Sequence, residues 1–143
     1  MTSNIQGEIP TRYKFIKNLP VEDGLGKIVV YNDFSDLPFM PKRFFTVTNN
    51  EANVTRGGHA HKSCEQVLFA IQGSIELQID DGKATHKILM NSSSQAVYIP
   101  IMLWSEQTYL SNNSVLGVFA SEPYNEAEYI RSYEVYKKLL DNN

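Results

Sequence analysis

Two histidines separated by one residue are the clearest chemical feature of this sequence. His59 and His61 belong to the stretch R-G-G-H-A-H-K, and Arg56 precedes the first of them by three positions. On a β-strand, residues i and i+2 project from the same face, about 6.5–7 Å apart along the chain. Both imidazoles are therefore expected to enter one space.

Three kinds of site are compatible with this pair. Purely structural histidines are the first, although titratable groups crowded inside a barrel are costly unless they serve a purpose. A metal site is the second, because two imidazoles on one strand can bind Zn, Fe, Mn or Ni. Such a site needs further ligands. The nearest candidates are Glu65 and Gln66, while His86 lies on a segment that is predicted to face solvent.

Acid–base catalysis without a metal is the third kind of site. An imidazole whose pKa lies near 6.5 can take and return a proton at neutral pH. Two of them in one pocket suit reactions that move a carbonyl along a sugar through an enediol, because a proton leaves one carbon and arrives at the next. The developing oxyanion would need a hydrogen-bond donor, either the second histidine or a nearby hydroxyl.

The composition is that of a single globular domain, residues 1–143. The chain is 42% hydrophobic and its net charge is −3, which gives no electrostatic reason to expect nucleic acid or an anionic membrane as partner. The lone Cys64 indicates a reducing compartment and is expected to be a small buried side chain. No signal peptide and no apolar run of ~18 residues is found. A cytoplasmic protein is expected.

Short alternating segments predict the elements that must hold the histidines. Residues 74–80 place Ile75, Leu77 and Ile79 on one face and polar side chains on the other, which is the pattern of a half-exposed antiparallel strand. Residues 80–83 predict a hairpin turn after it, and residues 21–27 an earlier turn. Further strands are predicted at 13–16, 27–31, 43–48, 84–89, 96–99, 105–109 and 115–120.

About eight short strands with no helix among them predict an all-β protein, a β-sandwich or barrel. After Pro123 the pattern changes, and residues 133–140 predict a short helix against the edge of the sheet. The tyrosines of this last segment are predicted to pack or to form dimer contacts rather than to catalyse. They are Tyr124, Tyr129, Tyr133 and Tyr136.

The sequence resembles a known family over residues 21–136. The matching features are R-G-G-H-A-H-K followed by Gln66, the glycine at position 73, the D-D-G hairpin, Y-I-P before a tryptophan, and E-Y-I-R-S-Y near the end. Together they are similar to the WxcM-like cupins, whose best-known members are dTDP-sugar 3,4-ketoisomerases. The resemblance implies a small jelly roll, commonly a homodimer that exchanges N-terminal strands, which acts without metal or other cofactor.

The same resemblance implies a reaction. The expected substrate is dTDP-4-keto-6-deoxyglucose or a close relative, whose keto group moves from C4 to C3. His59 and His61 would be the catalytic pair, one of them carrying a proton between C3 and C4, and Arg56 would lie near the diphosphate or the sugar. The general cupin pattern expects metal ligands where this chain has Gln66 and Ser105, which agrees with the metal-free interpretation.

Departures from the family pattern bear on the reaction. Residues 43–47 contain no tyrosine, where family members carry one proposed to assist at the sugar, and Thr46 is the hydroxyl available there. Leu25 replaces the arginine of an early Asp-x-Arg-Gly turn, and the usual P-P-G-x-W corner is P-I-M-L-W. Two alternatives therefore stay open: a non-catalytic cupin that binds sugar nucleotides, and a metal-dependent cupin enzyme.

Three more residues are candidates for substrate binding. Tyr98 and Trp104 flank a corner where an aromatic ring can stack on a nucleotide base. Arg131 can bind phosphate, or it can pair with Glu128 or Glu134. The predicted substrate-binding residues are thus Thr46, Arg56, Gln66, Tyr98, Trp104 and Arg131.

Overall fold

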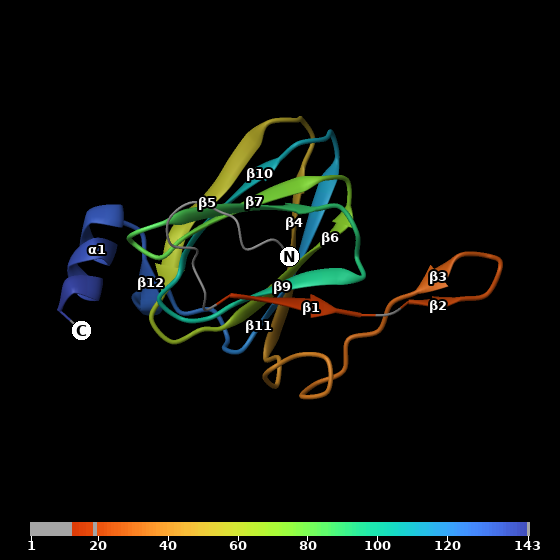
Figure 1. Cartoon of the computed structure of the whole chain (residues 1–143), viewed down its shortest axis with the longest axis horizontal. Coiled ribbons are helices and arrows are strands. Elements are labelled where there is room, and N and C mark those ends of the chain that lie inside the picture. The colour runs from red at the N-terminus through yellow and green to blue at the C-terminus, as the bar shows by residue number, and fades with distance from the viewer. Residues whose placement is uncertain (1–12, 19, 143) are drawn as a thin grey trace.

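The computed structural model describes residues 13–18 and 20–142, which form two packed antiparallel β-sheets (Figure 1). The first sheet consists, in spatial order, of β1 (Lys14–Lys17), β9 (Gln95–Ile99), β6 (Gln66–Gln72), β11 (Ser114–Ala120) and β4 (Arg43–Asn49). The second consists of β12 (Tyr129–Ile130), β5 (Val54–His61), β10 (Trp104–Tyr109), β7 (Ile75–Asp80) and β8 (Thr85–Met90). The predicted jelly-roll sandwich is confirmed.

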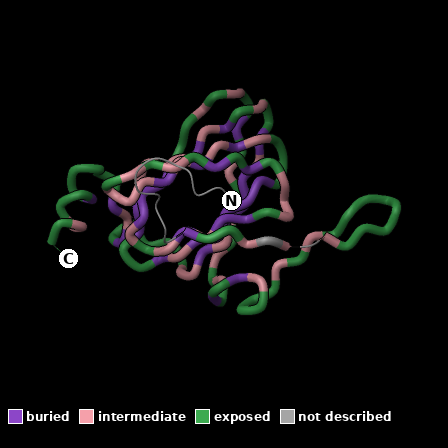
Figure 2. The backbone as a smooth tube through the Cα atoms, viewed as in Figure 1, coloured by how far each residue is buried: buried purple, intermediate pink, exposed green. Residues whose placement is uncertain are grey.

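Side chains that face between the sheets form the main hydrophobic core. Along β7, Ile75, Leu77 and Ile79 are fully buried while the residues between them are half-buried, as the alternating pattern predicts. They share one cluster with Leu68 and Val118 of the opposite sheet. Figure 2 shows that the buried positions line the inner faces of the two sheets. Burial of apolar area, about 25 cal/mol per Å², holds the layers together.

A short helix closes the chain. α1 spans Tyr133–Asp141, one residue beyond the predicted end, and the Ser132 side chain accepts a hydrogen bond from the backbone N–H of Val135 at its start. Tyr136 is fully buried, with its ring 5.6 Å from the ring of Trp104. The helix therefore covers the outer face of the second sheet. No helix in residues 20–142 is long and apolar enough to cross a membrane.

A small hairpin near the N-terminus extends away from both sheets (Figure 1). It consists of β2 (Val21–Glu22) and β3 (Lys27–Ile28), and its turn is closed by a hydrogen bond from the Asp23 N–H to the Gly26 carbonyl. The strand predicted at 27–31 is wrong in length. Only Lys27 and Ile28 pair, because residues 29–31 have no neighbouring strand within residues 13–18 and 20–142.

Candidate active site

A cavity of about 200 Å³ lies between the sheets, with β4 on one side and β5 on the other. The wall on β4 and β11 is apolar, whereas β5, β10 and the segment around β12 supply polar groups. The lining residues are Phe45, Val47, Arg56, Gly57, His59, Gln66, Leu68, Gln107, Tyr109, Leu116, Val118, Tyr129 and Arg131. Of the predicted site residues, the structure therefore brings His59, Arg56, Gln66 and Arg131 together.

An irregularity in β5 directs His59 into this cavity. Strand β10 pairs Ser105 with His59 but its next residue with Gly57, so Gly58 is an extra residue on β5. Both glycines have positive φ, 91° at Gly57 and 78° at Gly58, a region that disfavours other residues. A Cβ on Gly57 would lie 3.0 Å from Oε1 of Gln107. The R-G-G sequence thus permits a bulge that a side chain would obstruct.

Three rings meet at one end of the cavity. The imidazoles of His59 and His61 are perpendicular, with centroids 4.9 Å apart. The Tyr129 ring lies 5.0 Å from His59 and 4.4 Å from His61. Tyr129 reaches them because β12 pairs with β5 and places it opposite His61, where cross-strand side chains touch. His59 and Tyr129 line the cavity, whereas His61 is buried beside them.

A buried carboxylate holds His61. Nδ1 of His61 is hydrogen-bonded to Oε2 of Glu128, and the other oxygen of Glu128 accepts the backbone N–H groups of Ser63 and Cys64 at 3.2 and 3.1 Å. Burial acts to raise the pKa of Glu128, but the hydrogen bonds from His61 and the backbone hold it below its usual value. Glu128 is therefore ionised at neutral pH. We assign the proton of a neutral His61 to Nδ1, which leaves Nε2 as an acceptor.

Both histidines are neutral at pH 7. Burial lowers the pKa of His59 to about 4, and the charges of His61 and Arg131 act in the same direction. Burial also lowers the pKa of His61, and this effect exceeds the opposing influence of Glu128. Nδ1 of His59 has no hydrogen-bond partner in the described part of the chain. His59 is thus a neutral imidazole in a cavity, able to accept a proton.

The three buried donors His61, Cys64 and Glu128 resemble a metal-binding set by composition, since their ligand atoms lie within 4.8 Å of one another. Their surroundings do not fit a cation. A guanidinium nitrogen of Arg43 lies 3.8 Å from the sulfur of Cys64, and both oxygens of Glu128 already accept hydrogen bonds. The Cys64 side chain is buried, as predicted from the sequence.

Two arginines line the cavity. Nε of Arg56 donates to Oδ1 of Asn49 at 2.8 Å. Arg131 makes two hydrogen bonds to Glu126, of 2.7 and 2.9 Å, and its guanidinium lies 4.5 Å from the centre of the Tyr129 ring. The partner of Arg131 is therefore Glu126, rather than Glu128 or Glu134.

Comparison with known proteins assigns the family. A family model described as FdtA: WxcM-like, C-terminal, matches residues 11–141. The chain belongs to this WxcM-like family. A curated relative, the TDP-4-oxo-6-deoxy-α-D-glucose-3,4-oxoisomerase of Aneurinibacillus thermoaerophilus, is 33% identical over 127 residues, which are 89% of this chain and 91% of that protein.

Solved structures of similar proteins include two further ketoisomerases. QdtA, a sugar 3,4-ketoisomerase from Thermoanaerobacterium thermosaccharolyticum in complex with TDP, has a TM-score of 0.90 and 30% identity, covering 94% of this chain and 98% of that one. A variant of that enzyme was solved with TDP-4-keto-6-deoxyglucose. A 3,4-ketoisomerase from Helicobacter canadensis has a TM-score of 0.88 and 32% identity, covering 91% of this chain and 98% of the other.

Three predicted substrate-binding residues of this WxcM-like chain lie away from the cavity. Thr46 is exposed on the outer face of β4, because the inward positions of that strand are Phe45 and Val47. Tyr98 faces outward and its hydroxyl donates to Glu65 at 2.6 Å. Trp104 is buried beneath α1. Within one chain, none of the three reaches the histidines.

Two important residues were not singled out from the sequence. Glu128 was named only as a possible partner of Arg131, and Tyr129 was predicted to pack rather than to face a ligand. Both lie in the E-Y-I-R-S-Y segment, and Glu128 is 67 positions from His61. The resemblance to the WxcM-like cupins included that segment, and this was the sequence signal that could have identified both residues. His86 lies elsewhere, half-buried on β8 and stacked on Tyr13 at 5.8 Å.

Proposed function

We propose that this chain is a sugar-nucleotide 3,4-ketoisomerase, which moves the keto group of a dTDP-4-keto-6-deoxyhexose from C4 to C3 in deoxysugar biosynthesis. The observation that carries the proposal is the neutral His59 imidazole, which lines the cavity beside Tyr129 and Arg131. The relatives are named for this reaction or were solved with TDP and a TDP-4-keto sugar.

His59 is the base in this proposal. It removes the proton from C3, and the electrons of that bond form an enediolate across C3 and C4 with negative charge on O4. The same imidazole then returns the proton to C4 as O3 becomes the keto oxygen and the O3 proton passes to O4. His61 does not line the cavity, and its bond to Glu128 holds it in one tautomer, so its role is to support His59.

Substrate binding falls to the remaining polar residues of the cavity. Arg56 and Arg131 offer guanidinium groups to the diphosphate, and Gln66 offers an amide to the sugar hydroxyls. The cavity, about 200 Å³, is smaller than the roughly 300–1,000 Å³ common for small-molecule sites. We infer that it accepts the hexose, while the nucleotide extends beyond its mouth.

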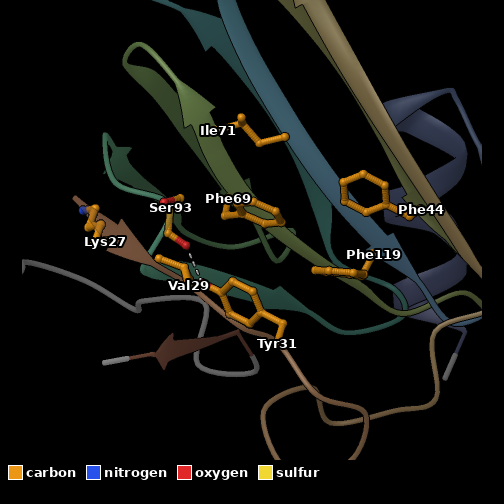
Figure 3. Close-up of a pocket in the computed structure, with 8 residues that line it drawn as sticks. All are labelled: Lys27, Val29, Tyr31, Phe44, Phe69, Ile71, Ser93 and Phe119. Atoms are coloured by element: carbon orange, nitrogen blue, oxygen red, sulfur yellow. Dashed lines mark hydrogen bonds between the residues drawn. The ribbon is translucent and has the colours of Figure 1, made fainter. Parts of the chain in front are cut away.

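The chain acts as a homodimer in this proposal, with exchange of the N-terminal strands. The outer face of the first sheet carries an apolar groove of about 440 Å³ (Figure 3). It is lined by Lys27, Val29, Tyr31, Phe44, Phe69, Ile71, Ser93 and Phe119. The projecting β2–β3 hairpin also exposes Val21, Leu25 and Ile28. Exposed apolar surface of this kind is typical of a protein–protein interface. In this proposal the N-terminal segment of a second copy of the chain packs on it.

The mass of the protein in solution tests the dimer. Light scattering should give twice the 16.2 kDa of one chain, and deletion of residues 1–30 should reduce it to one chain. A full-length protein that stays monomeric at micromolar concentration would contradict the exchange of strands.

The cytoplasmic location expected from the sequence also stays a prediction.

The reaction is tested by incubating the protein with dTDP-4-keto-6-deoxyglucose in D₂O. NMR should show loss of the C3 proton and appearance of the 3-keto product. Tight binding without exchange would instead favour the non-catalytic alternative, for which the hydroxyl-free wall of Phe45 and Val47 is the supporting observation. Stoichiometric metal in the purified protein, with activity lost on its removal, would favour the metal-dependent alternative.

A further inference from the structure

Tyr129 presents a hydroxyl with no hydrogen-bond partner in the described part of the chain. The neighbouring tyrosines differ in this respect. The hydroxyls of Tyr124 and Tyr133 each bind a carboxylate, and that of Tyr136 binds two backbone carbonyls. Because Tyr129 lines the cavity, its hydroxyl is available to a ligand there.

The ring of Tyr129 is held in place from several sides. The two imidazoles contact it at 5.0 and 4.4 Å, and the Arg131 guanidinium lies over its face at 4.5 Å. Arg131 is in turn fixed by Glu126 through two hydrogen bonds. A ring constrained in this way keeps its hydroxyl in a defined position, which is what acid–base chemistry requires.

Among the described residues, no other hydroxyl lines the histidine end of the cavity. The facing wall of β4 presents only Phe45 and Val47. Tyr109 also lines the cavity, but its hydroxyl is buried, and Tyr109 lies four residues along β10 from Ser105, the partner of His59. At about 3.3 Å per residue, that separation is roughly 13 Å along the strand. The oxygens of a sugar held at His59 therefore meet Tyr129 and not Tyr109.

We propose that Tyr129 is a second catalytic residue, which relays a proton between the two substrate oxygens while His59 relays one between the two carbons. This inference rests on the proposed function. In the first half, the C3–H bond breaks, its proton passes to His59, and the Tyr129 phenol gives its proton to O4, which yields the neutral enediol.

In the second half, the tyrosinate takes the proton from O3 as the carbonyl forms at C3, and His59 gives its proton to C4. One C–H and one O–H bond are broken and one of each is formed, so both residues return to their starting state and no co-reactant is needed. Donation to O4 stabilises the negative charge that develops there, as the hydrogen-bond donors of an oxyanion hole do.

The substitution Tyr129→Phe tests this relay, because it removes the hydroxyl and keeps the ring that packs on both histidines. We expect product formation to fall about 10²- to 10³-fold, the usual effect of removing one such donor. The Kd for TDP, measured by calorimetry, should change less than threefold. Turnover within threefold of the wild type would overturn the relay, and so would a loss of TDP affinity as large as the loss of turnover.

A matched control and a second variant complete the experiment. Tyr133→Phe removes a phenol hydroxyl from the same segment, where it binds Asp80 outside the cavity, and should leave turnover within twofold. If Tyr129→Phe does not fold, 2,3-difluorotyrosine at position 129 keeps ring and hydroxyl but is more acidic. It should move the alkaline limb of kcat to lower pH, and an unmoved limb overturns the relay. Failure of the wild type to form product overturns the proposed function instead.

Discussion

His59 and His61 are two residues apart on one strand, yet the two regions around them differ. His59 lines a cavity, has an Nδ1 without a partner, and faces the charge of Arg131. His61 is buried and its Nδ1 is hydrogen-bonded to Glu128, a carboxylate fixed by two backbone N–H groups. One region meets the cavity, whereas the other is held by Glu128, and Nε2 of His61 is buried there without a hydrogen-bond partner among the described residues.

This difference separates two roles that an H-x-H pattern alone leaves equivalent. A base must be neutral, accessible and free to take a proton, and His59 meets these conditions. A supporting group must be held in one orientation and one tautomer, and His61 meets those. The contrast arises because β12 places Tyr129 at the His61 end of β5, and the short 3-10 helix η1 (Glu126–Glu128) just before it places Glu128 there, while the bulge at Gly58 turns His59 toward the cavity.

The largest expected effect is that of His59→Asn. Loss of the base should reduce C3–H exchange and turnover by about 10²- to 10⁴-fold, because no other neutral imidazole lines the cavity in residues 20–142. TDP should still bind, since the arginines are unchanged. The same assay on His61→Asn provides the comparison. If His61→Asn costs more turnover than His59→Asn, the roles assigned to the two regions are reversed.

An intermediate effect is expected from Glu128→Gln. The amide keeps the size of the side chain but donates to Nδ1 of His61, which moves the imidazole proton to Nε2. Loss of a carboxylate that orients a histidine commonly costs 10- to 100-fold at metal sites, and we expect a fall in kcat of about this size with an unchanged Kd for TDP. Glu122→Gln, which alters an exposed hydrogen bond to Ser63, serves as the control. Wild-type kcat in Glu128→Gln would show that the tautomer of His61 does not matter.

A smaller effect concerns stability and pH. An unfolded histidine binds its proton near pH 6.5, whereas the pKa of folded His59 is about 4. Between these values the unfolded chain binds more protons, so the free energy of unfolding should decrease as the pH is lowered from 6.5 to 4. The lowered pKa of His61 acts in the same direction. Urea denaturation at several pH values should show a shallower slope for His59→Asn than for the wild type; equal slopes would contradict a buried neutral His59.

Local patterns were sufficient to predict much of this molecule. Alternation predicted the strand that became β7, the H-x-H spacing predicted adjacent imidazoles, and R-G-G-H-A-H-K predicted the family, which is confirmed. These features depend on residues close in sequence. Glu128 and Tyr129 depend instead on a two-residue strand that pairs across the fold with β5. No periodicity in so short a strand could predict its partner or register.

The misplaced residues have separate physical causes. Tyr98 and Trp104 flank a corner at which Met102 has a φ of 60°, so the faces of the two strands could not be related by counting residues. Tyr98 faces outward from the first sheet and Trp104 lies under α1. The position of Thr46, by contrast, follows from the sequence, since Phe45 and Val47 flank it on a regular strand. Because these two face the cavity, the alternation of a strand places Thr46 on the outer face.

The smallest expected effect follows from that alternation. Thr46→Val removes a hydroxyl from the exposed face of β4, and both turnover and the free energy of unfolding should stay close to wild type, the latter within about 0.5 kcal/mol. Val47→Thr, one residue further, places a hydroxyl of the same size against the apolar wall of the cavity. It should lower the free energy of unfolding by about 1–3 kcal/mol in urea denaturation, because it replaces a methyl group on this apolar wall by a hydroxyl. A tenfold loss of turnover in Thr46→Val would contradict this arrangement, since it would mean that the outer face of β4 contributes to a site that the described part of one chain does not form.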